Sequence, residues 1–217
     1  MASQFSRGEV RSIIVAWLVL SFGLSYRFII ALLGGATVDL EYISAALMAT
    51  STGFILHEMG HKFVAIRHGY VAHFQIWIWG IALTLITAIL SGGGFLFGAP
   101  GAVYIAPAAI GYYGYGYYSS NYKTSDPERE NMIISAAGPG INLAFALLFF
   151  LLYYLTPITG FVSIVAFFGF ELNVVLGSFN MLPIPPLDGF KIFKNNIAVA
   201  LAIALPLWLM FVYFFLI

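Results

Sequence analysis

The sequence has no cysteine and few charged residues. Only 8% of its 217 residues are charged, whereas a soluble domain carries about 25%. The lack of cysteine excludes disulfide bonds, thiolate metal ligands and a cysteine nucleophile, so histidine and carboxylate side chains would have to hold any metal. The formal net charge is zero, which argues against nucleic acid as a partner. The scarcity of charge also excludes an ordinary soluble domain.

Hydrophobic residues make up most of the chain instead. Their share is 61%, and the mean hydropathy of +0.95 is typical of a protein embedded in a lipid bilayer. Because about 20 apolar residues cross a bilayer, we expect a single all-α membrane domain with about six transmembrane segments. Five apolar runs are clear, and they cover residues 12–34, 42–67, 131–155, 158–182 and 196–217.

A less regular apolar region covers residues 74–110. It opens with a helix-like stretch over 75–90, and glycine clusters break it at 92–94 and around Pro100. We expect either a helix followed by a short extended return or a re-entrant hairpin. Irregular backbone is tolerated at membrane depth only where protein or a water-filled cavity covers it, so this region is predicted to line part of the interior.

The basic residues predict the orientation in the membrane. Eight of the nine Lys and Arg residues fall on one side if the region 74–110 enters and leaves on that side, and only Arg27 lies inside a span. The positive-inside rule makes this side cytoplasmic. It would hold the N-terminus and the end of the span 42–67.

The segment His57-Glu58-Met59-Gly60-His61 lies near the end of the second apolar run. Ionisable side chains are costly at this depth and usually mark a functional site. In a helix, residues i and i+4 project from nearly the same face, so His57 and His61 can bind one zinc ion. Glu58 can then act as general base toward a water molecule at the metal. The alternative is a pair of core histidines.

A proline-rich segment follows the fourth clear run. Residues 180–189 read Asn-Met-Leu-Pro-Ile-Pro-Pro-Leu-Asp-Gly, and their three prolines predict an extended, kinked path. Such a path can direct Asp188 back into the bundle as a third zinc ligand. Three protein ligands and an open fourth position are typical of a catalytic zinc site. The alternative is a turn in which Asp188 caps the segment that follows.

These motifs together resemble the site-2 protease family of intramembrane zinc metalloproteases, peptidase family M50. His-Glu-x-x-His at 57–61 and Asn-x-x-Pro-x-Pro-x-Leu-Asp-Gly at 180–189 carry the resemblance. Residues 137–142, Ala-Gly-Pro-Gly-Ile-Asn, are similar to the family's Ala-Gly-Pro-x-x-Asn signature. The resemblance implies a catalytic core of three helices, which would cover residues 42–67, 131–155 and 158–188.

The resemblance also implies the cofactor and the roles of the site residues. One zinc ion would be bound by His57, His61 and Asp188, with Glu58 as the catalytic base. Neutral donors near the metal can bind the substrate backbone or the oxyanion, and the resemblance implies this role for Asn180 and Asn142. Interhelical hydrogen bonding is the alternative for each asparagine.

The implied reaction is hydrolysis of a peptide bond in or near the transmembrane segments of membrane-protein substrates, as in regulated intramembrane proteolysis. Two other classes of protein stay open. A metal-ion transporter would need several histidines or carboxylates along a path, and a membrane scaffold would have no need for Glu58. We expect Glu171, inside an apolar run, to serve structure rather than chemistry. The sequence does not determine the substrate, the trigger or the oligomeric state.

Overall fold

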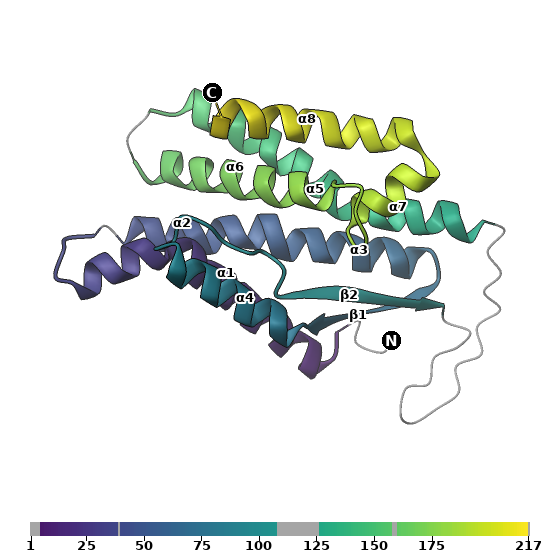
Figure 1. Ribbon diagram of the computed structural model, residues 1–217, viewed down its shortest axis with the longest axis horizontal. Helices are drawn as coiled ribbons and strands as arrows, with labels where there is room; N and C mark the ends of the chain where they lie inside the picture. Colours follow the sequence, from purple (N-terminus) through teal and green to yellow (C-terminus); the bar gives the residue numbers. More distant parts are fainter. Residues whose placement is uncertain (1–4, 39, 108–125, 158–159, 217) are drawn as a thin grey trace.

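The protein is a bundle of helices with one small sheet (Figure 1). A computed structural model describes residues 5–38, 40–107, 126–157 and 160–216, so residues 108–110, 158–159 and 217 of the expected segments lie outside the described part. In chain order the elements are α1 (Arg7–Leu33), α2 (Glu41–Thr50), the π-helical turn η1 (Ser51–Ile55), α3 (Leu56–Arg67), β1 (Tyr70–Ile76), α4 (Ile78–Leu90), β2 (Gly101–Pro107), α5 (Pro127–Leu155), α6 (Phe161–Asn180), α7 (Asp188–Asn195) and α8 (Ile197–Leu216).

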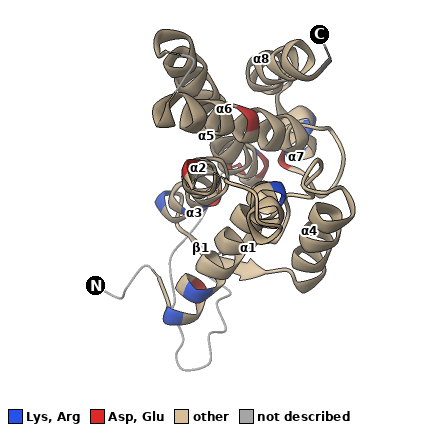
Figure 2. Cartoon of the chain, turned by 90° about the vertical axis from the view of Figure 1, so that its left-hand side faces the viewer, with Lys and Arg blue, Asp and Glu red and all other residues tan. Residues whose placement is uncertain are grey.

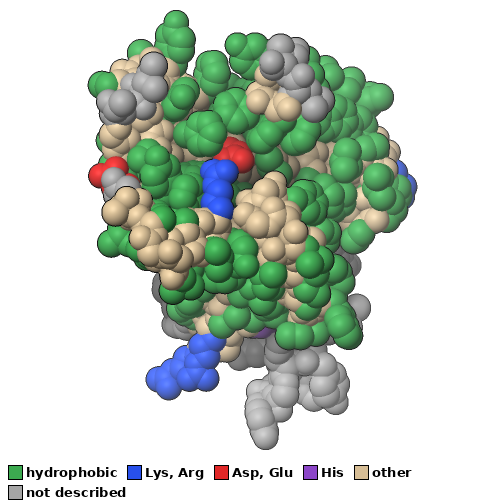
Figure 3. Space-filling view, turned by 60° about the vertical axis from the view of Figure 1, so that its left-hand side comes forward, with side chains coloured by type: hydrophobic (Ala, Val, Ile, Leu, Met, Phe, Trp, Pro, Cys, Tyr) green, Lys and Arg blue, Asp and Glu red, His purple; other side chains and the backbone are tan. Residues whose placement is uncertain are grey.

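Four of the described helices, α1, α5, α6 and α8, are long and apolar enough to cross a membrane. In addition, α2, η1 and α3 follow one another without a gap, so residues 41–67 form one helical run over the range expected for the second span. Large apolar side chains cover most of the face shown in Figure 3, with few charged groups among them. The chain is therefore a membrane protein.

Helix α6 forms the centre of the bundle. Its apolar stretch is 67% buried, compared with 28% for α1 and 17% for α8. It packs against α5, α2 and α8, and Figure 1 shows it between the layer of α8 and the layer of α2 and α3. The peripheral helices α1 and α8 thus leave apolar sides uncovered by protein, as lipid-facing helices do.

The two strands close the region between them into a loop. Their antiparallel register pairs Ile76 with Gly101, and the Trp77 N–H donates to the carbonyl of Pro100 (2.9 Å). Helix α4, inside this loop, has 13 residues, which is about 20 Å of helix and too short for a bilayer core of roughly 30 Å. The segment 78–100 therefore leaves the bundle where it enters. The expected helix with an extended return is present as α4 and β2, and the pairing of β2 with β1 adds a small sheet to the expected helices.

Local sequence signals set the starts of α1 and α5 and the end of α3. Ser6 Oγ accepts from the Glu9 N–H (3.1 Å) at the start of α1, and Asp126 Oδ1 accepts from the Arg129 N–H (3.0 Å) at the start of α5. Gly69 has a φ of +80° directly after α3, a conformation that other residues rarely adopt. This glycine turns the chain from the histidine-bearing helix into β1.

One end of the bundle gathers the start of α1, the end of α3, the start of α5 and helix α7 (Figure 1). Figure 2 shows how few charged residues the remaining parts of the helices carry. Lys123 lies outside the described residues, and Arg27 lies within α1. The basic residues in the gathered segments are Arg7, Arg11, Lys62, Arg67, Arg129, Lys191 and Lys194.

Candidate metal centre

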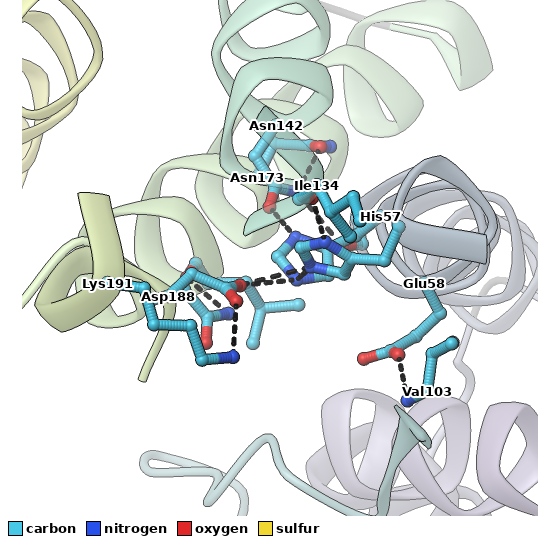
Figure 4. Close-up of polar contacts among 12 residues, drawn as sticks. His57, Glu58, Val103, Ile134, Asn142, Asn173, Asp188 and Lys191 are labelled. Atoms are coloured by element: carbon cyan, nitrogen blue, oxygen red, sulfur yellow. Dashed lines mark hydrogen bonds and ion pairs between the residues drawn. The ribbon is translucent and has the colours of Figure 1, made fainter. Parts of the chain in front are cut away.

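The two histidines of the expected site lie on one face of α3, shortly after the π-helical turn. His57 is 5% exposed and His61 is 6% exposed. Their Nε2 atoms are 3.1 Å apart, and Figure 4 shows His57 among its polar partners. The four-residue spacing thus brings the two imidazoles together, as the helix geometry predicts.

A hydrogen bond at Nδ1 of each ring fixes the orientation and the tautomer of the two imidazoles. His57 Nδ1 lies 2.6 Å from Asn142 Oδ1, and His61 Nδ1 lies 2.8 Å from the carbonyl oxygen of Ile134. Both oxygens can only accept, so each Nδ1 must carry the hydrogen and donate it. In the neutral rings both Nε2 atoms then keep a free lone pair, the form in which histidine binds a metal.

Asp188 joins the two histidines from the other side. It is the first residue of α7, and the N-cap of this helix, Leu187, makes no side-chain cap hydrogen bond. Asp188 Oδ2 lies 3.0 Å from His61 Nε2 and 3.6 Å from His57 Nε2, and its second oxygen lies 3.8 Å from Lys191 Nζ. The carboxylate therefore faces the imidazoles instead of capping its own helix.

The three donor atoms fit a single cation. One atom from each of His57, His61 and Asp188 lies within 4.8 Å of the other two. Lone pairs on two nitrogens and a carboxylate oxygen repel one another unless a positive charge lies between them. With metal–ligand bonds of about 2.0–2.1 Å, tetrahedral zinc separates its ligand atoms by about 3.3 Å. The observed separations of 3.0, 3.1 and 3.6 Å lie on either side of this value.

Glycines at the contact between α3 and α5 leave room for the cluster. A Cβ added at Gly138 would lie 2.7 Å from His57 Nε2 and closer still to His61 Nε2. A Cβ at Gly60 would lie 3.3 Å from the Ala137 carbonyl oxygen. Both glycines let the two helix backbones approach closely, as small residues do between membrane helices. The Ala-Gly-Pro segment therefore forms one wall of the metal site.

Glu58 lies beside the cluster and reaches toward the sheet. It is 9% exposed, and its Oε2 accepts a hydrogen bond from the Val103 N–H of β2 (3.0 Å). Figure 4 shows the carboxylate between the metal-binding side chains and Val103. A carboxylate in this position can exchange a proton with a water molecule at the metal.

Comparison with known proteins identifies the family. The sequence model of peptidase family M50 matches residues 45–161, which is more than half of the chain. The chain belongs to peptidase family M50. A predicted zinc metalloprotease of Methanocaldococcus jannaschii is 33% identical over 204 residues, 94% of this chain and 93% of that protein. One from Bacillus subtilis is 36% identical over 78 residues, 32% of this chain and 36% of that protein. No solved structure matches the chain.

Membership of M50 and the names of these relatives imply zinc as the cofactor of this metalloprotease. The family match ends before Asp188, whereas the match with the archaeal relative covers nearly the whole chain. The donor set of two histidines and one carboxylate suits zinc in a chain without cysteine.

The structure distinguishes the two asparagines of the predicted M50 site. Asn142 is fully buried; its Oδ1 accepts from His57, and its Nδ2 donates to the Gly53 carbonyl (2.9 Å) and to Asn173 Oδ1 (3.0 Å). With its amide engaged in this way, Asn142 orients His57 and has no hydrogen left for a substrate. These contacts are those of the interhelical alternative, and a role of Asn142 toward a substrate stays a prediction. Asn180 Nδ2 donates to the Leu176 carbonyl of its own helix (3.0 Å), and its role toward a substrate stays a prediction.

The sequence did not predict two hydrogen bonds of the M50 site. The first is the Ile134 carbonyl of α5, which accepts from His61 Nδ1. The second is the Val103 N–H that donates to Glu58. Both are backbone groups, so no residue type marks them in the sequence.

Proposed function

We propose that this membrane metalloprotease is an endopeptidase that hydrolyses peptide bonds in or near the transmembrane segments of membrane-protein substrates. The observation that carries the proposal is the position of Glu58, between the metal-binding cluster and the edge of β2. A protease needs a base within reach of the metal, and an extended substrate needs a backbone edge beside that base. The site offers both, because Glu58 follows His57 in α3 and contacts the edge of β2.

The side chains divide the chemistry among them. His57, His61 and Asp188 would hold zinc, which when bound polarises carbonyl groups and makes water a stronger acid. Glu58 would take the proton from the attacking water and deliver it to the leaving amine. Asn142 would keep His57 in the tautomer that can bind the metal.

The edge of β2 supports binding of an extended substrate. A transmembrane helix hides its amides in its own hydrogen bonds, so it must unwind before hydrolysis. The Val103 N–H points to Glu58 and away from β1, which shows that one edge of β2 faces the base. A substrate strand that adds to this edge would bring its backbone past Glu58.

The charge distribution supports a cytoplasmic position for the site. The basic residues of the described chain lie mostly in segments at one end of the bundle, together with the end of α3 and helix α7. Under the positive-inside rule, this end and the N-terminus would lie on the cytoplasmic side. Within the described residues the histidines and acids form a single candidate metal group, whereas a transport path would need several such groups.

Cleavage of single-span membrane proteins in reconstituted vesicles tests the proposal. We expect zinc-dependent cleavage inside or next to the transmembrane segment, with internal cut sites mapped by mass spectrometry of both product ends. Addition of a chelator should abolish both products. Removal of single terminal residues, or cleavage confined to soluble peptides, would contradict an endopeptidase that acts on transmembrane segments.

A further inference from the structure

A buried ion pair joins α1 to α3 next to the metal site. Glu9, in the first turn of α1, and Lys62, which follows His61 in α3, are each 1% exposed and bond to one another through Oε1 and Nζ. Lys62 Nζ also donates to the Ala72 carbonyl of β1 (3.2 Å). The metal site as described above makes no use of this pair.

Glu9 and Glu58 bind opposite edges of the antiparallel pair β1–β2, which we call the hairpin, at the same pair of facing residues. Glu9 Oε1 accepts from the Phe74 N–H (2.9 Å), and Glu58 Oε2 accepts from the Val103 N–H (3.0 Å). Phe74 and Val103 are partners in the β1–β2 register. In an antiparallel pair, partners that do not bond to one another direct their N–H groups outward to both sides. The position of Val103 relative to Glu58 thus depends on where Glu9 holds Phe74.

We propose that Glu9, together with Lys62, is a positioning residue for Glu58: the pair sets the height and tilt of the hairpin and so the contact between β2 and the base. This inference rests on the proposed role of Glu58. A buried ion pair is seldom the most stable way to fill a core, because apolar residues of similar volume often replace it without loss. Glu9 and Lys62, however, bond to the backbone of two alternate strand residues, Phe74 and Ala72, which apolar side chains cannot do.

Hydrogen exchange of the hairpin tests the coupling without any need for activity. Glu9→Gln keeps the size of the side chain and removes its charge. We expect faster exchange in peptides that cover 70–76 and 101–107, unchanged exchange in α5, and unchanged zinc content. Against a cleavable transmembrane substrate, kcat should fall roughly tenfold to a hundredfold, the loss expected when reacting groups shift by about 1 Å.

A matched control separates positioning from stability. Thr50 Oγ1 and Ser21 Oγ form another buried contact of α1, at 2.6 Å, far along the helix from Glu9. Thr50→Val should lower the melting temperature but leave hairpin exchange and kcat unchanged. If Glu9→Gln behaves in the same way as Thr50→Val, the positioning role is wrong.

A second variant covers the case in which Glu9→Gln does not fold. Glu9→Gln combined with Lys62→Met replaces the charged pair by a neutral one of similar volume and removes the donor to the Ala72 carbonyl. We expect it to fold and to show faster exchange in 70–76 and 101–107, and native exchange in this variant would overturn the inference. If the native chain cleaves no substrate, the proposed function fails on that result alone, while the exchange data still decide whether Glu9 controls the hairpin.

Discussion

Gly138 provides the sharpest test of the metal-site geometry. The residue lies on α5 where this helix faces the two imidazoles, and a Cβ built there would lie 2.6 Å from His57 Cε1 and 2.7 Å from His57 Nε2. Ordinary contact begins near 3.4 Å. Gly138→Ala would therefore push the His57 ring away by about 0.7–0.8 Å and the still closer His61 ring by more, or move α5 away from both. Ligand distances in metal sites tolerate only about 0.2 Å.

The expected loss is in zinc affinity rather than in folding. Disturbance of the groups that orient zinc ligands costs about 10- to 100-fold in affinity, which corresponds to about 1.4–2.8 kcal/mol. The same substitution favours the helix by up to about 1 kcal/mol, because alanine has a higher helix propensity than glycine. Gly138→Ala is thus expected to bind zinc weakly while the metal-free protein stays folded.

Gly140→Ala is the matched control, because a Cβ at this neighbouring position of α5 meets no atom within 4 Å. Zinc content after competition with a graded chelator, the melting temperature of the metal-free protein and the cleavage rate would be measured for both variants. Gly140→Ala should match the native chain in zinc affinity and cleavage. Native zinc affinity in Gly138→Ala would refute the proposed placement of the metal between His57, His61 and Asp188.

Three further predictions concern the neighbours of the metal. Asn142→Ala removes the acceptor of His57 Nδ1 and should weaken zinc binding about 10- to 100-fold, measured by chelator competition; unchanged affinity would mean that Asn142 does not orient His57. Zinc at about 100 times its dissociation constant should stabilise the fold by about 2.7 kcal/mol. A chelator should therefore lower the melting temperature of the native chain but not that of Asp188→Ala. Equal shifts of the melting temperature in both proteins would place zinc elsewhere. Val103→Pro removes the N–H that donates to Glu58 and should lower kcat/KM about tenfold or more with zinc retained. Val103→Ala keeps the N–H and should stay near the native rate. Equal rates in the two variants would argue against a role for this contact.

The proximity of the two histidines of α3 followed directly from the sequence. Helical spacing places His57 and His61 on one face whatever the rest of the fold does. Asp188 was predicted because the prolines before it prevent a continuous helix, and the structure places its carboxylate 3.0 Å from His61 Nε2. The sequence could predict this grouping of side chains because each step depends on local backbone rules, and zinc binding by the three residues stays a prediction.

The sheet and its contacts depend on long-range pairing that no local pattern specifies. Strand β1 pairs with residues about 30 positions later in the chain, and its seven residues have no strict alternation of apolar and polar side chains. The sequence also could not predict the hydrogen-bond partners of Asn142. A buried asparagine between helices can bind a substrate or a neighbouring side chain, and the residue type is the same in both cases. In the structure both hydrogens of its amide are donated within the bundle.

We propose that one zinc ion on His57, His61 and Asp188 works with Glu58 as base. The most direct test measures zinc content and cleavage on the same preparations of the native chain, Glu58→Gln and Asp188→Ala. We predict one zinc per chain with cleavage for the native protein, one zinc without cleavage for Glu58→Gln, and loss of both for Asp188→Ala. Cleavage at the native rate by zinc-loaded Glu58→Gln would contradict the claim.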